Sequence, residues 1–131
     1  MKYTCYTDGG YDNVNKRNGY GSFRIKSDFD DTTIRHIYPT IQSSNEAEYQ
    51  TFTDLLKFLI INIPEGSHNE VLIISDSRLL VNQVNCDWKV KAGNLVRYYK
   101  ESQVLLAELS KNCAIKLIWM SRKVLVKELG H

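Results

Sequence analysis

A short apolar run in the middle of the chain, Val71-Leu72-Ile73-Ile74, limits the possible folds more than any other segment. A near-continuous run of branched residues indicates a strand that is buried on both faces, as in the parallel part of an α/β sheet. Parallel strands need long crossover connections, which are usually helices. The run therefore predicts an α/β fold in which helices flank a sheet.

Strand and helix patterns alternate along the rest of the chain. In order they are strands 2–7, 19–26 and 32–40, a helix 45–61, the strand 71–74, helices 77–84 and about 94–110, a buried strand 115–120, and a helical segment from about 123 to the end. Ser44 or Asn45 is expected to cap the first helix. The order βββαβααβα predicts a mixed five-stranded sheet, with three antiparallel strands and then two parallel ones, in a single domain over residues 1–131.

Composition excludes several classes of protein. No apolar run approaches the ~20 residues of a membrane span, and the strand-like start, Met1-Lys2-Tyr3-Thr4, lacks the apolar stretch of a signal peptide. We therefore expect no membrane partner and a cytoplasmic location. Cys5, Cys86 and Cys113 are odd in number and far apart, which argues against a disulfide framework and against a zinc cluster.

The net charge of +2 hides an uneven distribution. Residues 1–77 hold 7 Lys and Arg against 11 Asp and Glu, a charge of −4, whereas residues 78–131 hold 10 against 4, a charge of +6. An acidic half and a basic half suit a metal-dependent nuclease, in which carboxylates hold cations and basic groups hold phosphates. Chance asymmetry on a solvated surface would look the same, so this signal is weak alone.

Three carboxylates stand where an α/β sheet places its ligands. Asp8 follows the first predicted strand, Asp76 follows the apolar run, and Glu48 lies in the first turn of the first helix. If the two strands are parallel neighbours, Asp8 and Asp76 emerge at the same end of the sheet. Converging carboxylates repel one another unless they share hard divalent cations. Two such ions ~3.5–4 Å apart can activate a water molecule and stabilise the leaving oxygen of a phosphodiester.

Each of these acids also has an ordinary structural interpretation. Asp8 with Gly9 can form a plain turn, Glu48 can complement the helix dipole, and Asp76 can cap the helix that follows it. The occurrence of all three at strand ends favours the metal-site interpretation.

Sequence motifs in a fixed order support that interpretation. They are YTDGG at 6–10, GYGSF at 19–23, SNEAEY at 44–49, IISDSRLLVNQV at 73–84, WKVK at 88–91 and WMSR at 119–122. In these motifs the chain resembles the type 1 ribonuclease H family over nearly its whole length. The resemblance is to its short bacterial and archaeal-type members, which lack a basic protrusion.

The resemblance implies a ribonuclease H-like fold and an endonuclease that hydrolyses the RNA strand of RNA–DNA hybrids with two Mg²⁺ ions, or with Mn²⁺. It implies that Asp8, Glu48 and Asp76 are the catalytic residues and the metal ligands. The second glutamate of the family's "N-x-A-E-Y" motif is the ligand, which selects Glu48 over Glu46.

The resemblance also implies substrate contacts. Ser44 and Asn45 occupy positions that touch the minor groove of the hybrid, where 2′-hydroxyls distinguish RNA from DNA. Gly9 and Gly10 would approach the scissile RNA strand. Trp88 could pack against a DNA sugar, but its size favours a place in the core. The basic residues that remain as phosphate contacts are Lys89, Lys91, Arg97 and Arg122.

The C-terminal segment departs from the family pattern "R-x-x-N-x-x-A-D-x-L", which supplies a fourth acid. Residues 122–131 read RKVLVKELGH and contain neither Asn nor Asp. Glu128 could serve as the fourth carboxylate, or the ammonium of Lys127 could occupy part of a metal site. In the third alternative, slightly favoured, Gly130 replaces the acid and His131 assists product release or proton transfer.

Three functions remain open at this point. The first is an active, monomeric nuclease that cuts RNA–DNA hybrids, and the second is a weak or inactive module that binds hybrid or duplex RNA without cutting it. The third is a related nuclease with another substrate, because a fold does not determine a function.

Overall fold

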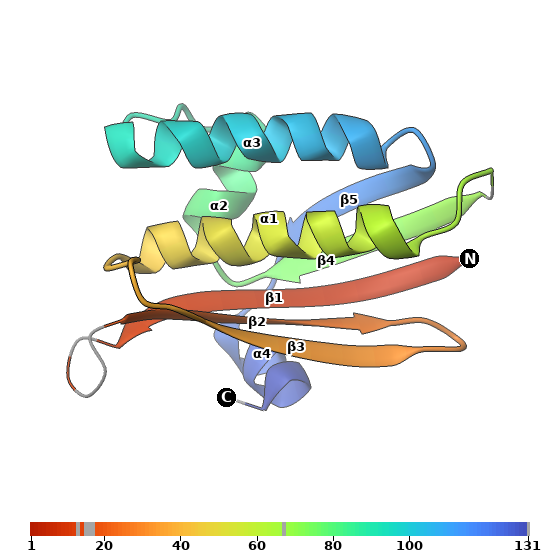
Figure 1. Ribbon diagram of the computed structural model, residues 1–131, viewed down its shortest axis with the longest axis horizontal. Coiled ribbons are helices and arrows are strands. Elements are labelled where there is room, and N and C mark those ends of the chain that lie inside the picture. Colours follow the sequence, from red (N-terminus) through yellow and green to blue (C-terminus); the bar gives the residue numbers. More distant parts are fainter. Residues whose placement is uncertain (13, 15–17, 67, 131) are drawn as a thin grey trace.

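The computed structural model describes residues 1–12, 14, 18–66 and 68–130 and contains a five-stranded mixed sheet with helices on both faces (Figure 1). The strands are β1 (Lys2–Asp12), β2 (Asn18–Lys26), β3 (Asp31–Tyr38), β4 (Asn69–Ser75) and β5 (Cys113–Trp119). The helices are α1 (Ser44–Asn62), α2 (Arg78–Val84), α3 (Gly93–Leu109) and α4 (Arg122–Leu129). His131, one candidate for the fourth active-site position, lies outside the described residues.

The strand order is β3-β2-β1-β4-β5, so the first strand in the sequence lies at the centre of the sheet. It pairs antiparallel with β2 on one side and parallel with β4 on the other, and β4 pairs parallel with β5. The expected element order and the mixed five-stranded sheet are therefore confirmed. No helix in the described ranges is long and apolar enough to cross a membrane.

The helices divide unequally between the two faces of the sheet (Figure 1). On one face α1, α2 and α3 cover the main core, in which Phe52 and Leu56 of α1 join Cys5 and Ile73 of the central strands. On the other face lies α4 alone, and a smaller cluster of buried residues holds it, namely Ile74, Leu125 and Leu129. Because side chains alternate along a strand, Ile73 and Ile74 point to opposite cores.

Several expected boundaries are wrong in ways that matter for the site. The first strand does not end at residue 7 but continues through Gly9 and Gly10 to Asp12, pairing with β2 throughout. The first helix is capped by Ser43, whose side chain accepts a hydrogen bond from the Glu46 backbone N–H, and not by Ser44 or Asn45.

The strand expected at residues 115–120 is present, but the expectation that it is buried is wrong. The strand β5 spans Cys113–Trp119 at the outer edge of the sheet, and only Cys113 and Leu117 in it are buried. An outer strand has a neighbour on one side only, so its remaining side chains stay partly accessible.

Candidate active site

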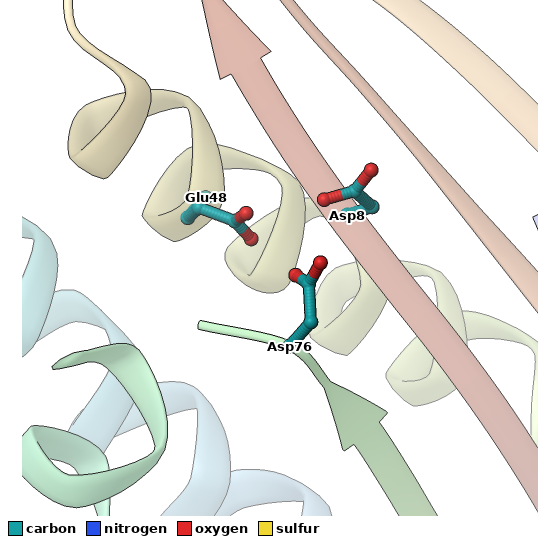
Figure 2. A group of neighbouring side chains, drawn as sticks. All are labelled: Asp8, Glu48 and Asp76. Atoms are coloured by element: carbon teal, nitrogen blue, oxygen red, sulfur yellow. The ribbon is translucent and has the colours of Figure 1, made fainter. Parts of the chain in front are cut away.

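The carboxylates of Asp8, Glu48 and Asp76 converge from three separate elements (Figure 2). Asp8 comes from β1, Glu48 from α1, and Asp76 from the residue after β4. One oxygen of each lies within 4.8 Å of the others. Among the residues that the structure describes, no other group of three or more Asp, Glu, His or Cys side chains lies close enough together to hold a metal ion.

The parallel pairing of β1 with β4 brings two of the three acids together. The last residues that pair between β1 and β4 are Thr7 and Ser75. Asp8 and Asp76 are the residues that follow them in the sequence. Asp8 thus lies inside β1 and not after it, but it does lie just beyond the end of the parallel ladder. The backbone of Asp76 is held in place because the indole of Trp119 donates a 3.0 Å hydrogen bond to its carbonyl oxygen.

Gly9 determines how closely the third acid can approach. A methyl group at Gly9 would lie 2.6 Å from the carbonyl carbon and oxygen of Ala47 and 2.7 Å from the backbone nitrogen of Glu48. These distances are far below an ordinary van der Waals contact, so only glycine allows the backbone of α1 to rest directly on β1. Glu48 therefore reaches Asp8 because residue 9 has no side chain.

Gly21 provides the matching space on the neighbouring strand. It pairs with Gly9 across β1 and β2, and a methyl group there would collide with the side chain of Thr51. The Thr51 hydroxyl donates a 2.7 Å hydrogen bond to the carbonyl oxygen of Ala47, one turn earlier in α1. Sequence reasoning noted the Gly-x-Gly motif of this strand but missed its positioning role.

The structure separates the two glutamates of the first helical turns. Glu46 accepts a 2.7 Å hydrogen bond from the side-chain amide of Asn94 at the start of α3, away from the other acids. Glu48 is buried, with 7% of its surface exposed, and faces Asp8 and Asp76. The geometry thus brings Glu48 into the cluster and leaves Glu46 outside it.

Burial and mutual repulsion make the cluster reluctant to carry three negative charges. The pKa of Glu48 is raised well above its usual value, first by burial and then by the charges of Asp8 and Asp76. The pKa of Asp76 is also raised, by burial and by Asp8, although the guanidinium of Arg122 opposes this shift. Arg122 lies 3.5 Å from the Asp76 carboxylate.

These features fit a divalent cation. The Oε2 atom of Glu48 is buried and has no hydrogen-bond partner, an arrangement that is unfavourable unless a ligand completes it. All three donors are carboxylate oxygens, the ligand type that hard cations such as Mg²⁺ prefer. A bound cation would also remove the repulsion that raises the two pKa values.

The candidates for a fourth position occupy different surroundings. Glu128 lies 3.2 Å from Arg24 and 3.6 Å from Lys26, so its carboxylate is paired with β2 and not with the three acids. Lys127 is exposed on the last turn of α4, and Gly130 ends the helix with a left-handed φ of 80°. Counted from Arg122, the family's acid falls on Leu129, which is buried in the small α4 core.

The four residues proposed to contact substrate differ in exposure, because Gly9 is half-buried and Gly10 is buried, whereas the other two lie on the surface. Ser44 and Asn45 are exposed in the first turn of α1. Asn45 borders a cavity of about 610 Å³ together with Trp88, Lys89 and Lys91. The expectation that Trp88 belongs to the core is wrong, because half of its surface is exposed in the connection between α2 and α3.

Gly10 has a local packing role that the sequence did not reveal. A methyl group at Gly10 would lie 2.5 Å from the hydroxyl oxygen of Tyr20, so the Tyr20 ring lies over this glycine. A large cross-strand ring next to a glycine explains why β1 continues where the glycine pair predicts a loop.

Comparison with known proteins identifies relatives of this fold. The family described as RNase H matches residues 1–122, whereas no curated protein sequence matches the chain. The chain is similar to LC11-RNase H1, isolated from compost by a metagenomic approach, with a TM-score of 0.76, 20% identity, and coverage of 97% of this chain and 89% of that one.

Two further solved structures have the same fold. The N-terminal RNase H domain of a Mycobacterium tuberculosis protein gives a TM-score of 0.74 at 21% identity, over 97% of this chain and 87% of that one. RNase H1 from Halobacterium salinarum gives 0.74 at 15% identity, over 95% and 89%.

Proposed function

The chain belongs to the ribonuclease H family, and on that basis we propose that it hydrolyses the RNA strand of RNA–DNA hybrids with Asp8, Glu48 and Asp76 as its catalytic carboxylates. The observation that carries the proposal is the convergence of these three acids within 4.8 Å, just beyond the end of the ladder between the central strands β1 and β4. LC11-RNase H1 has also been solved in complex with an RNA/DNA hybrid. The expectations of a monomer and of a cytoplasmic location stay predictions.

The three carboxylates would hold two Mg²⁺ ions, with Mn²⁺ as a second candidate. When bound, such a pair would activate a water molecule and stabilise the leaving oxygen of the phosphodiester. Glu48 is buried and carried by a helix that rests on the sheet, so its carboxylate is presented from a rigid position. Arg122 lies beside Asp76 with 64% of its side chain exposed, which leaves guanidinium donors free for a phosphate.

The surface around α1 would hold the hybrid. Ser44 and Asn45 are exposed where they could meet the 2′-hydroxyls of the minor groove. The neighbouring cavity brings the exposed Trp88 together with Lys89 and Lys91. An aromatic ring flanked by ammonium groups suits a sugar with its adjacent phosphates, so this region is assigned to the DNA strand.

The test is cleavage of an end-labelled RNA–DNA hybrid in Mg²⁺ and in Mn²⁺. We expect cuts within the RNA strand and a loss of at least about 100-fold in Asp8→Asn and in Asp76→Asn. The matched control is Asp28→Asn, which removes an exposed carboxylate in the turn between β2 and β3. The proposal fails if the wild type does not cut, or if the site variants cut as well as this control.

A second candidate function is binding without cleavage, because Glu128, the acid of the C-terminal helix, is paired with Arg24 and Lys26 and not with the three acids. A hybrid-binding module would show salt-dependent affinity without turnover under any divalent ion. Double-stranded RNA and DNA belong in the same panel, because cleavage of either in preference to the hybrid would indicate a related nuclease.

A further inference from the structure

A cavity of about 780 Å³ lies near the carboxylate cluster, and Arg122, which contacts Asp76, forms part of its wall. Apart from Arg122, its lining residues have no substrate contact in the proposed function. Its walls include Tyr20, Ser22, Arg35, Ile37 and Arg122. This volume lies within the range of sites for small organic ligands.

The strand register arranges these residues in two rows beside Asp8. In the first row Asp8 pairs with Ser22, and Ser22 pairs with Arg35. Neighbouring strands lie about 4.8 Å apart, so the metal-binding acid and the arginine are separated by roughly 10 Å along the row. One row therefore has the carboxylate of Asp8 at one end and the guanidinium of Arg35 at the other.

The second row is aromatic and apolar. Gly10 pairs with Tyr20, and Tyr20 pairs with Ile37. The Tyr20 ring lies over Gly10, and Ile37 is 59% exposed, so the row forms an apolar platform next to the charged row. A partly exposed ring of this kind, as Tyr20 is, combined with neighbouring arginines is the arrangement with which proteins bind unpaired nucleotides.

Two arginines of β2 and β3 are bonded to the end of α4, and one of them, Arg35, lines the cavity. A 2.9 Å hydrogen bond runs from the guanidinium of Arg35 to the carbonyl oxygen of Leu129, and a second runs from Arg24 to the carbonyl oxygen of Glu128. Both bonds hold the end of α4 against β2 and β3. Arg122, at the other end of α4, contacts Asp76, so one side chain borders both the cavity and the catalytic cluster.

We propose that this cavity binds one unpaired nucleotide of the RNA strand next to the scissile phosphate, with its base on Tyr20 and Ile37 and its phosphate between Arg35 and Arg122. A base within a duplex has both faces stacked on its neighbours, so only an unpaired base can lie on the Tyr20 platform. The inference rests on the proposed function, and it adds a preference for hybrids that carry an unpaired RNA nucleotide at the cut site.

The first experiment tests the cavity without catalysis. AMP, adenosine and inorganic phosphate are titrated separately into the full chain without divalent ions, while the backbone amide signals of Tyr20, Ser22 and Ile37 are followed by NMR. We expect AMP to shift these signals at millimolar concentration and the other two probes to bind more weakly. Tyr20→Leu should weaken AMP binding about 5- to 100-fold, whereas Tyr20→Phe should retain it.

The second experiment measures KM and kcat for a blunt hybrid and for one with an unpaired RNA nucleotide beside the cut. We expect a lower KM for the second substrate, and we expect Tyr20→Leu to abolish this difference. The matched control is Phe29→Leu, which removes an exposed aromatic ring in the turn between β2 and β3 and should leave the KM ratio unchanged.

The outcomes separate the two ideas. If wild type cuts hybrids but AMP shifts none of the three signals, or phosphate alone reproduces the shifts, the nucleotide site is refuted and the proposed function stands. An unchanged KM ratio in Tyr20→Leu also refutes it. If AMP binds at Tyr20 but no hybrid is cut, the cavity assignment stands and the proposed nuclease function fails.

Discussion

The two faces of the sheet differ in how firmly they hold the helices that cover them. On one face α1 and α3 pack over a continuous core that includes Phe52, Leu56 and Ile73. On the other, α4 rests on a cluster whose buried members are Ile74, Leu125 and Leu129, supplemented by arginine bonds to its last carbonyl groups. None of the three converging acids is carried by α4, because they come from β1, from α1 and from the end of β4, and α4 adds only Arg122 beside Asp76.

This difference accounts for a well-formed three-acid cluster beside a C-terminal helix whose one acid, Glu128, is paired with Arg24 and Lys26 instead. A helix in a large core can be displaced only by disrupting many contacts, so Glu48 is held firmly. An eight-residue helix with few buried side chains can change its sequence with less effect on the fold. Each prediction below tests one side of this comparison.

The largest effect is expected from Gly9→Ala, which attacks the close contact between α1 and β1. The added methyl group would meet backbone atoms of Ala47 and Glu48, which cannot rotate away. We expect a loss of about 4 kcal/mol or more in the free energy of unfolding, and weaker Mn²⁺ binding because Glu48 is displaced. Urea denaturation and metal titration measure the two quantities.

The control for this substitution is Gly93→Ala at the start of α3, where the added methyl group meets nothing within 4 Å. It should change stability by less than about 1 kcal/mol. If Gly9→Ala were as stable as Gly93→Ala and bound Mn²⁺ normally, Gly9 would not position Glu48.

The second prediction compares the same substitution on the two faces. Leu56→Ala in α1 and Leu125→Ala in α4 each remove a fully buried leucine side chain. Each should cost about 3 kcal/mol at its own site. Because α4 has the smaller core, Leu125→Ala should appear as local opening of α4 in hydrogen exchange, whereas Leu56→Ala should lower the global unfolding free energy. Equal global losses would mean that α4 is as well integrated as α1.

The comparison also shows what could be predicted from the sequence. The order of elements and the three acids followed from hydrophobic periodicity and from motifs, both of which are local signals. The extension of β1 did not, because Gly9 and Gly10 usually mark a turn and their role depends on Tyr20 and α1. Trp88 was misjudged for a related reason, since its size suggests burial while the short connection that carries it leaves half of it exposed.

The third prediction concerns the repulsion between the acids. The pKa of Glu48 is raised in the fold, so the folded protein binds the proton more tightly than the unfolded chain does. The metal-free protein should therefore lose stability as the pH rises from about 4.5 through the pKa of the folded state. Glu48→Gln should stabilise the metal-free protein by about 1–2 kcal/mol at pH 7 and flatten this pH dependence.

Thermal unfolding between pH 4.5 and pH 8, with and without Mg²⁺, checks this prediction. In the wild type Mg²⁺ should raise the melting temperature at pH 7 because it binds only the folded state. In Glu48→Gln the increase should be smaller. A variant less stable than wild type at pH 7 without metal would show that the Glu48 carboxylate is not under strain.

The smallest effect is expected from Glu128→Gln, and it decides between two roles for this acid. In the structure the Glu128 carboxylate is paired with Arg24 and Lys26, on the α4 side of the sheet. If that pairing is its role, the substitution should lower the melting temperature slightly and change kcat less than about threefold, because an ion pair near the surface contributes little. If Glu128 instead moves to complete the metal site during turnover, kcat should fall by tenfold or more and the Mg²⁺ concentration needed for half-maximal activity should rise. Lys26→Gln is the matched control, since it weakens the same ion pair without removing an acid. If both variants have the same small effect, Glu128 is not a metal ligand and the catalytic cluster has three carboxylates.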